Sequence, residues 1–352
     1  MASSPSYIPY LCVAAAAFIT TFLAVPLVKR LAIKLDAVDY PSKRRINTKP
    51  IPRLGGTAVF LGLVVACIVQ ILGTWYLGWP PVLVPHPRLH ISYPMLALSF
   101  TVIFATGAID DLFQLTPKQK LAGQVLAALI ACMGGLKIGV IVNPFAPGEI
   151  MLGWLAYPIT VIYLVAFTNI INLIDGLDGL ACGVSTISAI SMLVIALLVS
   201  ESDVALVMAA LVGACLGFMP YNKNPAKMFM GDTGSTFLGY ILATISIQGL
   251  FKYYAIVSFA VPFLILGLPM FDTLFAIIRR LAHGQNPMAP DRGHIHHRLI
   301  DMGFSQKQAV AIAYMLTGIL GLAAVLLTFV LALEGLYCFV VFTDIPASKS
   351  LR

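Results

Sequence analysis

Long apolar segments separated by short polar loops dominate this chain of 352 residues. The segments are continuous and about 20 residues long, which suits helices that cross a bilayer, and they do not alternate as barrel strands do. The apolar segments lie near 7–28, 55–77, 93–109, 121–136, 155–174, 181–199, 204–220, 235–250, 255–278 and 308–333. The pattern predicts an all-α polytopic membrane protein with about ten transmembrane helices. A further run, Gly335–Thr343, is too short to cross comfortably and is a weak eleventh candidate.

The composition agrees with this prediction. The chain is 59% hydrophobic and 11% charged, whereas soluble domains carry about a quarter charged residues. No stretch reads as a separate soluble domain, so we expect residues 1–352 to form a single integral-membrane domain. The net charge of +7 does not indicate nucleic-acid binding, because the basic residues occupy short loops between the apolar segments.

The basic residues are distributed unequally between the two sides. Only Arg88, Lys137 and Lys252 lie in the loops of one side. The other side has 17 Lys and Arg residues, in loops 29–54, 110–120, 175–180, 221–234 and 279–307. The positive-inside rule places these five loops in the cytoplasm and the N-terminus outside. We expect the five loops to form an active site, and the external loop Lys137–Gly153 to form a small β-hairpin.

Four polar residues lie at the end of the apolar segment that finishes near Ile174. Asn169, Asn172, Asp175 and Asp178 recur every three residues, so a helix would bring most of them near one face. Polar groups on an apolar helix are costly without partners, which favours a functional site. The alternative is a polar contact between helices followed by a turn.

Adjacent carboxylates end the third segment. Asp110 and Asp111 repel each other, and the negative end of a helix adds to this cost. A divalent cation or a shared proton would relieve the repulsion, and Lys118 and Lys120 follow closely. A solvated loop is the alternative interpretation.

A glycine-flanked carboxylate begins the eighth segment. Asp232 stands between Gly231 and Thr233, where it is a candidate ligand, although Asp is also an ordinary N-cap. Phe229 could stack on a flat base, or simply anchor in the membrane.

Basic residues mark two further loops. His294, His296, His297 and Arg298 form a candidate phosphate-binding cluster, since zinc is poorly supported by their spacing. Arg53, in a proline-containing loop, either contacts phosphate or only sets the topology. The several carboxylates in these loops suggest a metal site. Mg²⁺ favours carboxylates together with substrate phosphates. The site therefore looks suited to two phosphorylated substrates at the membrane interface.

These motifs together resemble the polyprenyl-phosphate N-acetylhexosamine-1-phosphate transferases. The resemblance covers residues 39 to 298, and the His-Ile-His-His string is similar to the bacterial undecaprenyl-phosphate N-acetylglucosaminyl-1-phosphate transferases. The first loop departs from the family pattern, with Ser42 and Asn47 where the family has Asn and His. The matching positions are Asp110, Asp111, Lys120, Gln124, Asn169, Asn172, Asp175, Asp178, Asn222, Phe229, Asp232, His294, His296 and His297.

The resemblance implies transfer of N-acetylglucosamine-1-phosphate from UDP-N-acetylglucosamine to undecaprenyl phosphate, with release of UMP, in the bacterial inner membrane. It implies Mg²⁺, or Mn²⁺ in its place, held by Asp232 and Asp110. Asp110 and Asp111 are the expected catalytic residues, and Lys120 and Arg53 the expected phosphate contacts. The expected substrate-binding residues are Asn172, Asp175, Asp178 and Phe229 at the nucleotide, and His294, His296, His297 and Arg298 at the diphosphate or sugar.

Two other functions remain open at this point. One is a phospho-N-acetylmuramoyl-pentapeptide transferase, which differs in its sugar donor. The other is an ion-coupled membrane transporter, because polar residues within membrane segments also mark such pathways. The oligomeric state is not determined by the sequence, and a homodimer is one option.

Overall fold

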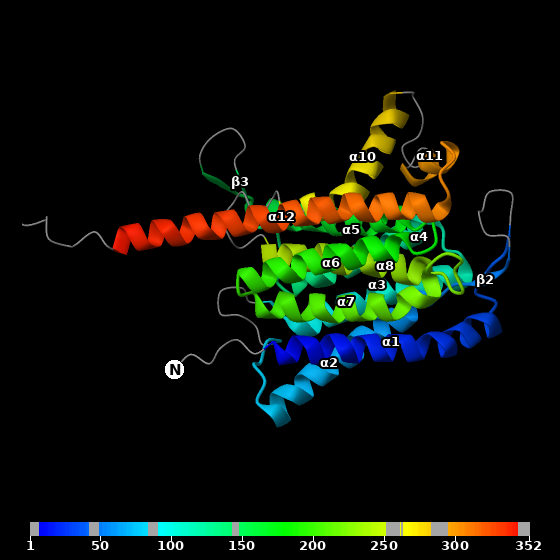
Figure 1. Ribbon diagram of the computed structural model, residues 1–352, viewed down its shortest axis with the longest axis horizontal. Coiled ribbons are helices and arrows are strands. Elements are labelled where there is room, and N and C mark those ends of the chain that lie inside the picture. The colour runs from blue at the N-terminus through cyan, green and yellow to red at the C-terminus, as the bar shows by residue number, and fades with distance from the viewer. Residues whose placement is uncertain are drawn as a thin grey trace, which may run out of the picture.

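A computed structural model describes residues 7–41, 49–83, 91–142, 148–250, 261, 263–282 and 295–343. Most of these residues form helices that run side by side in one bundle, with small two-stranded sheets at its margins (Figure 1). The helices are α1 (Ile8–Lys34), α2 (Gly55–Leu77), α3 (Tyr93–Phe113), α4 (Pro117–Met133), α5 (Ala156–Ile174), α6 (Leu180–Leu198), α7 (Ser202–Asn222), α8 (Gly231–Leu250), α10 (Gly267–Ala282), α11 (Ile295–Asp301) and α12 (Gln306–Thr343).

Each predicted apolar segment overlaps a helix, which confirms the helical class. For 255–278 the overlap is limited to α10, because residues 251–260 and 262 lie outside the described part of the chain. Within the described residues, seven helices are long and apolar enough to cross a membrane, namely α1, α2, α3, α5 with its preceding turn, α6, α7 and α12. The predicted number of about ten is therefore not confirmed.

The helices that fall short do so for physical reasons. α4 and α10 have only 17 and 16 residues. α8 has 20 residues but contains several buried hydroxyl and amide side chains. It packs against α2, α3, α5, α6 and α7, so its polar groups face protein and not lipid. α8 is thus the central helix of the bundle.

The last helix corrects one prediction. Gly335–Thr343 is not a separate element, because α12 continues without a break from Gln306 to Thr343. At 1.5 Å per residue its 38 residues extend about 57 Å, well beyond a hydrocarbon core of about 30 Å. Figure 1 shows the C-terminal part of α12 projecting past the other helices.

Two antiparallel hairpins flank the bundle. β3 (Val140–Val142) pairs with β4 (Glu149–Met151), which confirms a hairpin in the loop Lys137–Gly153. β1 (Val38–Asp39) pairs with β2 (Ile51–Pro52), and the sequence did not predict this sheet. Its strands have only two residues each, too few for an alternating pattern. Figure 1 shows β2 at one end of the bundle and β3 toward the other.

The start of α2 lies against the start of α8. Gly55 N–H donates to the Phe229 carbonyl at 3.0 Å, and Gly56 N–H donates to the Met230 carbonyl at 2.9 Å. A Cβ atom on Gly56 would lie 2.1 Å from the Gly234 nitrogen, so only glycine fits there. Gly55 and Gly56 thus allow the close packing that joins the start of α2 to the loop before α8.

Candidate active site

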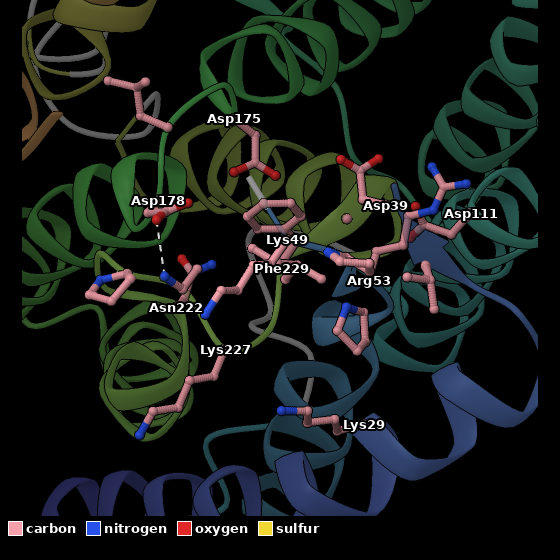
Figure 2. Close-up of a pocket in the computed structure, with 18 of the residues that line it drawn as sticks. Lys29, Asp39, Lys49, Arg53, Asp111, Asp175, Asp178, Asn222, Lys227 and Phe229 are labelled. Atoms are coloured by element: carbon pink, nitrogen blue, oxygen red, sulfur yellow. Dashed lines mark hydrogen bonds between the residues drawn. The ribbon is translucent and has the colours of Figure 1, made fainter. Parts of the chain in front are cut away.

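A cavity of about 1110 Å³ opens at the end of the bundle where β1–β2 lies. Its walls come from the C-terminal part of α1, the β1–β2 hairpin, the turn 175–178, the loop 222–231 and the first residue of α12. Figure 2 shows acidic and basic side chains facing it from different elements, with Phe229 near the centre. The predicted site residues that line it are Arg53, Asp111, Asn172, Asp175, Asp178, Phe229 and Asp232.

A lysine joins four helices beside the cavity. Lys120 Nζ lies 3.0 Å from Asp110 Oδ2 and 2.7 Å from Asp232 Oδ1. It also donates to Asn172 Oδ1 at 3.1 Å. Asn172 Nδ2 in turn donates to Asp232 Oδ1 and, at 2.8 Å, to Ser235 Oγ. One ammonium group therefore pairs with two carboxylates, which leaves a net negative charge, and its contacts orient the Asp232 side chain.

Asp111 is almost fully buried and caps the N-terminus of α8. Its Oδ1 accepts from Asp232 N–H at 3.1 Å, and its Oδ2 accepts from Thr233 N–H at 2.8 Å and from the Thr233 hydroxyl. Gly231 has a φ of +73°, and a Cβ there would meet the Asp111 carboxylate at 2.4 Å. The side chain of Asp111 thus places Asp232, which itself lies in the first turn of α8.

Asp110 and Asp111 have separate partners within the protein. Asp110 accepts from Leu115 N–H at 2.8 Å and pairs with Lys120, whereas Asp111 binds the positive end of the α8 dipole. These contacts relieve part of the expected repulsion, and the predicted cation beside the two carboxylates stays a prediction.

The predicted helical face through Asn169, Asn172, Asp175 and Asp178 is only partly correct. α5 ends at Ile174, so Asp175 is its C-cap and Asp178 lies in the turn beyond. Asn169 exchanges hydrogen bonds with Gln124, at 2.7 and 3.2 Å, and does not line the cavity. A turn, and not a continuous helix, brings the two aspartates to the cavity.

Asp175 lines the cavity, and its carboxylate has no partner in the described part of the chain. The Phe229 ring lines the same cavity, and Figure 2 shows the two side chains near each other in this view. Burial, followed by the negative charges of Asp232, Asp111 and Asp178, raises the pKa of Asp175 to about 8. This side of the cavity therefore has an excess of acidic groups.

Asp178 holds the loop that precedes α8. Its Oδ2 accepts from Asn224 Nδ2 at 2.8 Å and from Ala226 N–H at 3.0 Å. Asn224 Nδ2 also donates to Gln306 Oε1 at 2.6 Å. Our sequence interpretation gave no role to Asn224 or Gln306. No local pattern marks them, because their partners are 46 and 82 residues distant.

The loop also presents an amide and an aromatic ring. Asn222 Nδ2 donates to the Met228 carbonyl at 3.1 Å, while its buried Oδ1 has no hydrogen-bond partner in the described structure. Phe229 N–H donates to the Pro52 carbonyl at 2.9 Å. The backbone of Phe229 is thus held by β2 and α2, and its half-buried ring faces the cavity.

The structure describes only some of the basic residues predicted at the site. Arg53 lines the cavity, and its buried Nε has no partner within the described ranges. His294 lies outside the described residues, as do Ser42 and Asn47. His296 and His297 belong to α11, but their side chains are not described; Arg298 is exposed and does not line the cavity. The expected histidine cluster therefore stays a prediction.

The donor chemistry fits a hard cation better than zinc. In the described part of the chain, no three His, Cys, Asp or Glu side chains are close enough to hold a metal by themselves. Mg²⁺ does not need such a cage, because one or two carboxylates with substrate phosphates and water complete its shell. Asp232 Oδ1 accepts from Lys120 and Asn172, while Asp110 accepts from Leu115 N–H and pairs with Lys120. A carboxylate oxygen that accepts one hydrogen bond can still coordinate a cation, so both side chains stay predicted metal ligands.

Comparisons with known proteins point in one direction. Residues 93–250 match the model of glycosyl transferase family 4. The chain is 38% identical over 332 residues to a probable undecaprenyl-phosphate N-acetylglucosaminyl 1-phosphate transferase of Bacillus subtilis, covering 94% of this chain and 88% of that protein.

Two further relatives carry similar names. A decaprenyl-phosphate N-acetylglucosaminephosphotransferase of Mycolicibacterium smegmatis is 34% identical, over 88% of this chain and 79% of its own length. An undecaprenyl-phosphate alpha-N-acetylglucosaminyl 1-phosphate transferase of Salmonella typhi is 30% identical, over 86% of this chain and 80% of its own. The similarity therefore extends over nearly the whole chain, beyond the segment matched by the family model.

Proposed function

Because the chain belongs to glycosyl transferase family 4, we propose that it transfers N-acetylglucosamine-1-phosphate from UDP-N-acetylglucosamine to undecaprenyl phosphate. The product is undecaprenyl-diphospho-N-acetylglucosamine, and UMP is released. The 38% identity to the Bacillus subtilis relative supports the choice of donor and acceptor. The observation that carries the proposal is the cavity at which Lys120, Asn172 and Asp232 converge from three helices.

The reaction is a phosphoryl-type displacement. An oxygen of the acceptor phosphate attacks the β-phosphorus of the donor, and the bond from that phosphorus to the UMP oxygen breaks. Two anions must approach each other, so positive charge beside the reacting groups lowers the barrier. Lys120 lies beside the cavity wall, where substrate binding would let its ammonium group share this task. Bound Mg²⁺ would supply further neutralisation of the phosphates.

The protein side chains then divide into two roles. Asp232 would hold the metal, oriented by Lys120 and Asn172. Asp111 is a positioning residue, since both of its oxygens bind the first turn of α8. For Asp110 we propose a similar role through Lys120, while its predicted metal contact stays a prediction.

The nucleotide is assigned to the part of the cavity around Phe229. Its ring would stack on the uracil, with the open Asn222 Oδ1 and the turn bearing Asp175 and Asp178 around it. Arg53, which has a free Nε, would contact phosphate. The segment from His294 to Arg298 would contact the sugar or diphosphate, as the sequence suggests.

We also propose that the chain crosses a bacterial inner membrane about ten times as one domain, with the cavity in the cytoplasm. The support is the excess of basic residues in the loops on the cavity side, 17 against three. In this arrangement the polyprenyl tail stays in the bilayer while its phosphate meets a soluble nucleotide at the interface.

Release of UMP by the purified protein tests the proposal. Undecaprenyl phosphate, Mg²⁺ and either UDP-N-acetylglucosamine or the UDP-muramoyl-pentapeptide would be supplied, and lipid-linked product measured. We expect turnover of the first donor and loss of activity in excess chelator. Faster turnover of the muramoyl donor would favour the peptidoglycan branch. Solute uptake by proteoliposomes without UMP release would favour the transporter.

A further inference from the structure

The first residue of α12, Gln306, reaches the cavity. The sequence placed it at the end of the loop 279–307, which was expected to be part of the active site, but gave the residue itself no role. Gln306 lines the cavity, and its Oε1 accepts from Asn224 Nδ2 at 2.6 Å. The same nitrogen donates to Asp178 Oδ2 at 2.8 Å. The three side chains form a hydrogen-bonded row that links α12, the loop before α8 and the turn after α5.

This row supports the aromatic wall of the cavity. Asp178 Oδ2 also accepts from Ala226 N–H at 3.0 Å, so one carboxylate oxygen binds the loop through both Asn224 and Ala226. Phe229 follows three residues later in the same loop. Because Oδ2 is used for the loop, Oδ1 of Asp178 is left for the cavity that this residue lines.

α12 is held on the same turn at a second point. The Tyr314 hydroxyl donates to the Gly179 carbonyl at 2.6 Å. A Cβ on Gly183 would lie 2.0 Å from Tyr314 Cζ, so the ring packs directly on the start of α6. Gln306 and Tyr314 are eight residues apart and lie on one stripe of the helix. This second contact fixes the place at which Gln306 meets Asn224.

On the basis of the proposed function, we propose that Gln306 is a positioning residue for the nucleotide of the donor. It holds Asn224, which orients Asp178 and the loop that carries Phe229. Gln306 also follows Arg298 by only eight residues, so the segment expected to contact the sugar and diphosphate leads directly into the nucleotide wall. Changes at Gln306 should therefore affect the binding of donor and not the chemical step.

Steady-state kinetics of UMP release separate these effects. We expect Gln306→Met, which keeps the side-chain length but lacks the acceptor, to raise KM for UDP-N-acetylglucosamine about three- to tenfold, as for one neutral hydrogen bond. The value of kcat and the KM for undecaprenyl phosphate should stay within about twofold. Lys307→Ala is the control at the neighbouring position, because Lys307 is exposed and does not line the cavity. An unchanged donor KM in Gln306→Met would overturn the inference.

A double-mutant cycle tests the row itself. If Gln306 acts through Asn224, then Asn224→Ala combined with Gln306→Met should be no worse for donor KM than Asn224→Ala alone. Additive effects of the two substitutions would contradict the proposed row. This outcome does not depend on the absolute loss in either variant.

Binding of UMP separates this inference from the proposed function. If the wild-type protein released no UMP from UDP-N-acetylglucosamine, the proposed function would fail, but UMP affinity could still be measured by calorimetry. We expect Gln306→Met to weaken UMP binding about three- to tenfold, while Lys307→Ala matches the wild type. Equal UMP affinity in all three proteins would contradict the role of Gln306.

Discussion

α8 has a polar cluster at each end, and the two clusters differ in whether their unpaired acceptors lie beside the cavity. Near its C-terminus, Asp203 Oδ2 accepts from the Tyr93 hydroxyl and from Gln248 Nε2, both at 2.7 Å. Asp203 Oδ1 accepts from Val204 N–H at 2.9 Å. One carboxylate thus receives at least three donors. In the C-terminal cluster, Gln248 Oε1 is buried without a partner in the described structure, but Gln248 does not line the cavity. At the N-terminus of α8, the ammonium group of Lys120 pairs with two carboxylates, those of Asp110 and Asp232.

At the N-terminal end of α8, the acceptor groups without donors indicate a site for ligands. Asp175 has no partner among the described residues, and Asn222 Oδ1 is buried without one beside a large cavity. A carboxylate such as Asp203, whose oxygens accept from several donors, mainly joins helices. Acceptors without donors beside a cavity can instead bind a cation, together with the anion that the cation carries. Burial of polar groups in α8 alone would not separate these two cases.

The largest expected effect compares Asp232 with Asp203. Asp232→Asn should lower kcat for UMP release by about 10²–10³-fold or more, since it removes a charge placed at the reacting phosphates. Asp203→Asn should leave kcat within about twofold, because it lies at the other end of α8. Both rates would be measured with saturating donor, acceptor and Mg²⁺. Similar losses in the two variants would remove the distinction between the clusters.

The reverse comparison concerns stability. Asp203→Ala should destabilise the fold by about 1–3 kcal/mol, because it leaves Tyr93 and Gln248 without their shared acceptor. Thermal unfolding in detergent would show this as a lower melting temperature, and Tyr93→Phe should show a smaller decrease. A melting temperature equal to that of the wild type would show that the C-terminal cluster contributes little.

A smaller effect should appear in the pH dependence of stability. The pKa of Asp175 is raised from 3.8 to about 8, so the folded state retains a proton that the unfolded state loses. The stabilising contribution of Asp175 to the free energy of unfolding is fully present below pH 3.8 and decreases as the pH rises toward 8. In the absence of divalent cations, the melting temperature should therefore decrease between pH 5 and pH 8, and Asp175→Asn should reduce this slope. An identical slope in Asp175→Asn would contradict the assignment.

Addition of Mg²⁺ should also change how the melting temperature depends on pH. A cation near the carboxylates favours their charged forms, so Mg²⁺ should raise the melting temperature of the wild type most at high pH. Asp203→Asn should retain this response, and Asp232→Asn should lose most of it. A response of equal size in Asp232→Asn would indicate that Mg²⁺ binds elsewhere.

The sequence by itself determined the helical class, the motifs and, through them, the family. Apolar runs of membrane length report helices locally, because a backbone in lipid must satisfy its own hydrogen bonds. The same runs do not settle the number of spans, since a buried central helix such as α8 and a lipid-facing helix are both apolar. They also divided α12 in two at Gly335, where no helix break occurs.

Only the tertiary structure decided which polar groups are partners. Lys120 pairs with Asp232, 112 positions away, because α4 and α8 meet at one end of the bundle. Asp111 caps α8, a contact that the sequence did not predict, and Asn224 and Gln306 join the site without a motif of their own. Spacing along the chain specifies which residues share a helical face, but the choice of partner depends on which faces pack together. That choice is a long-range property, set by close contacts such as Gly56 against Gly234.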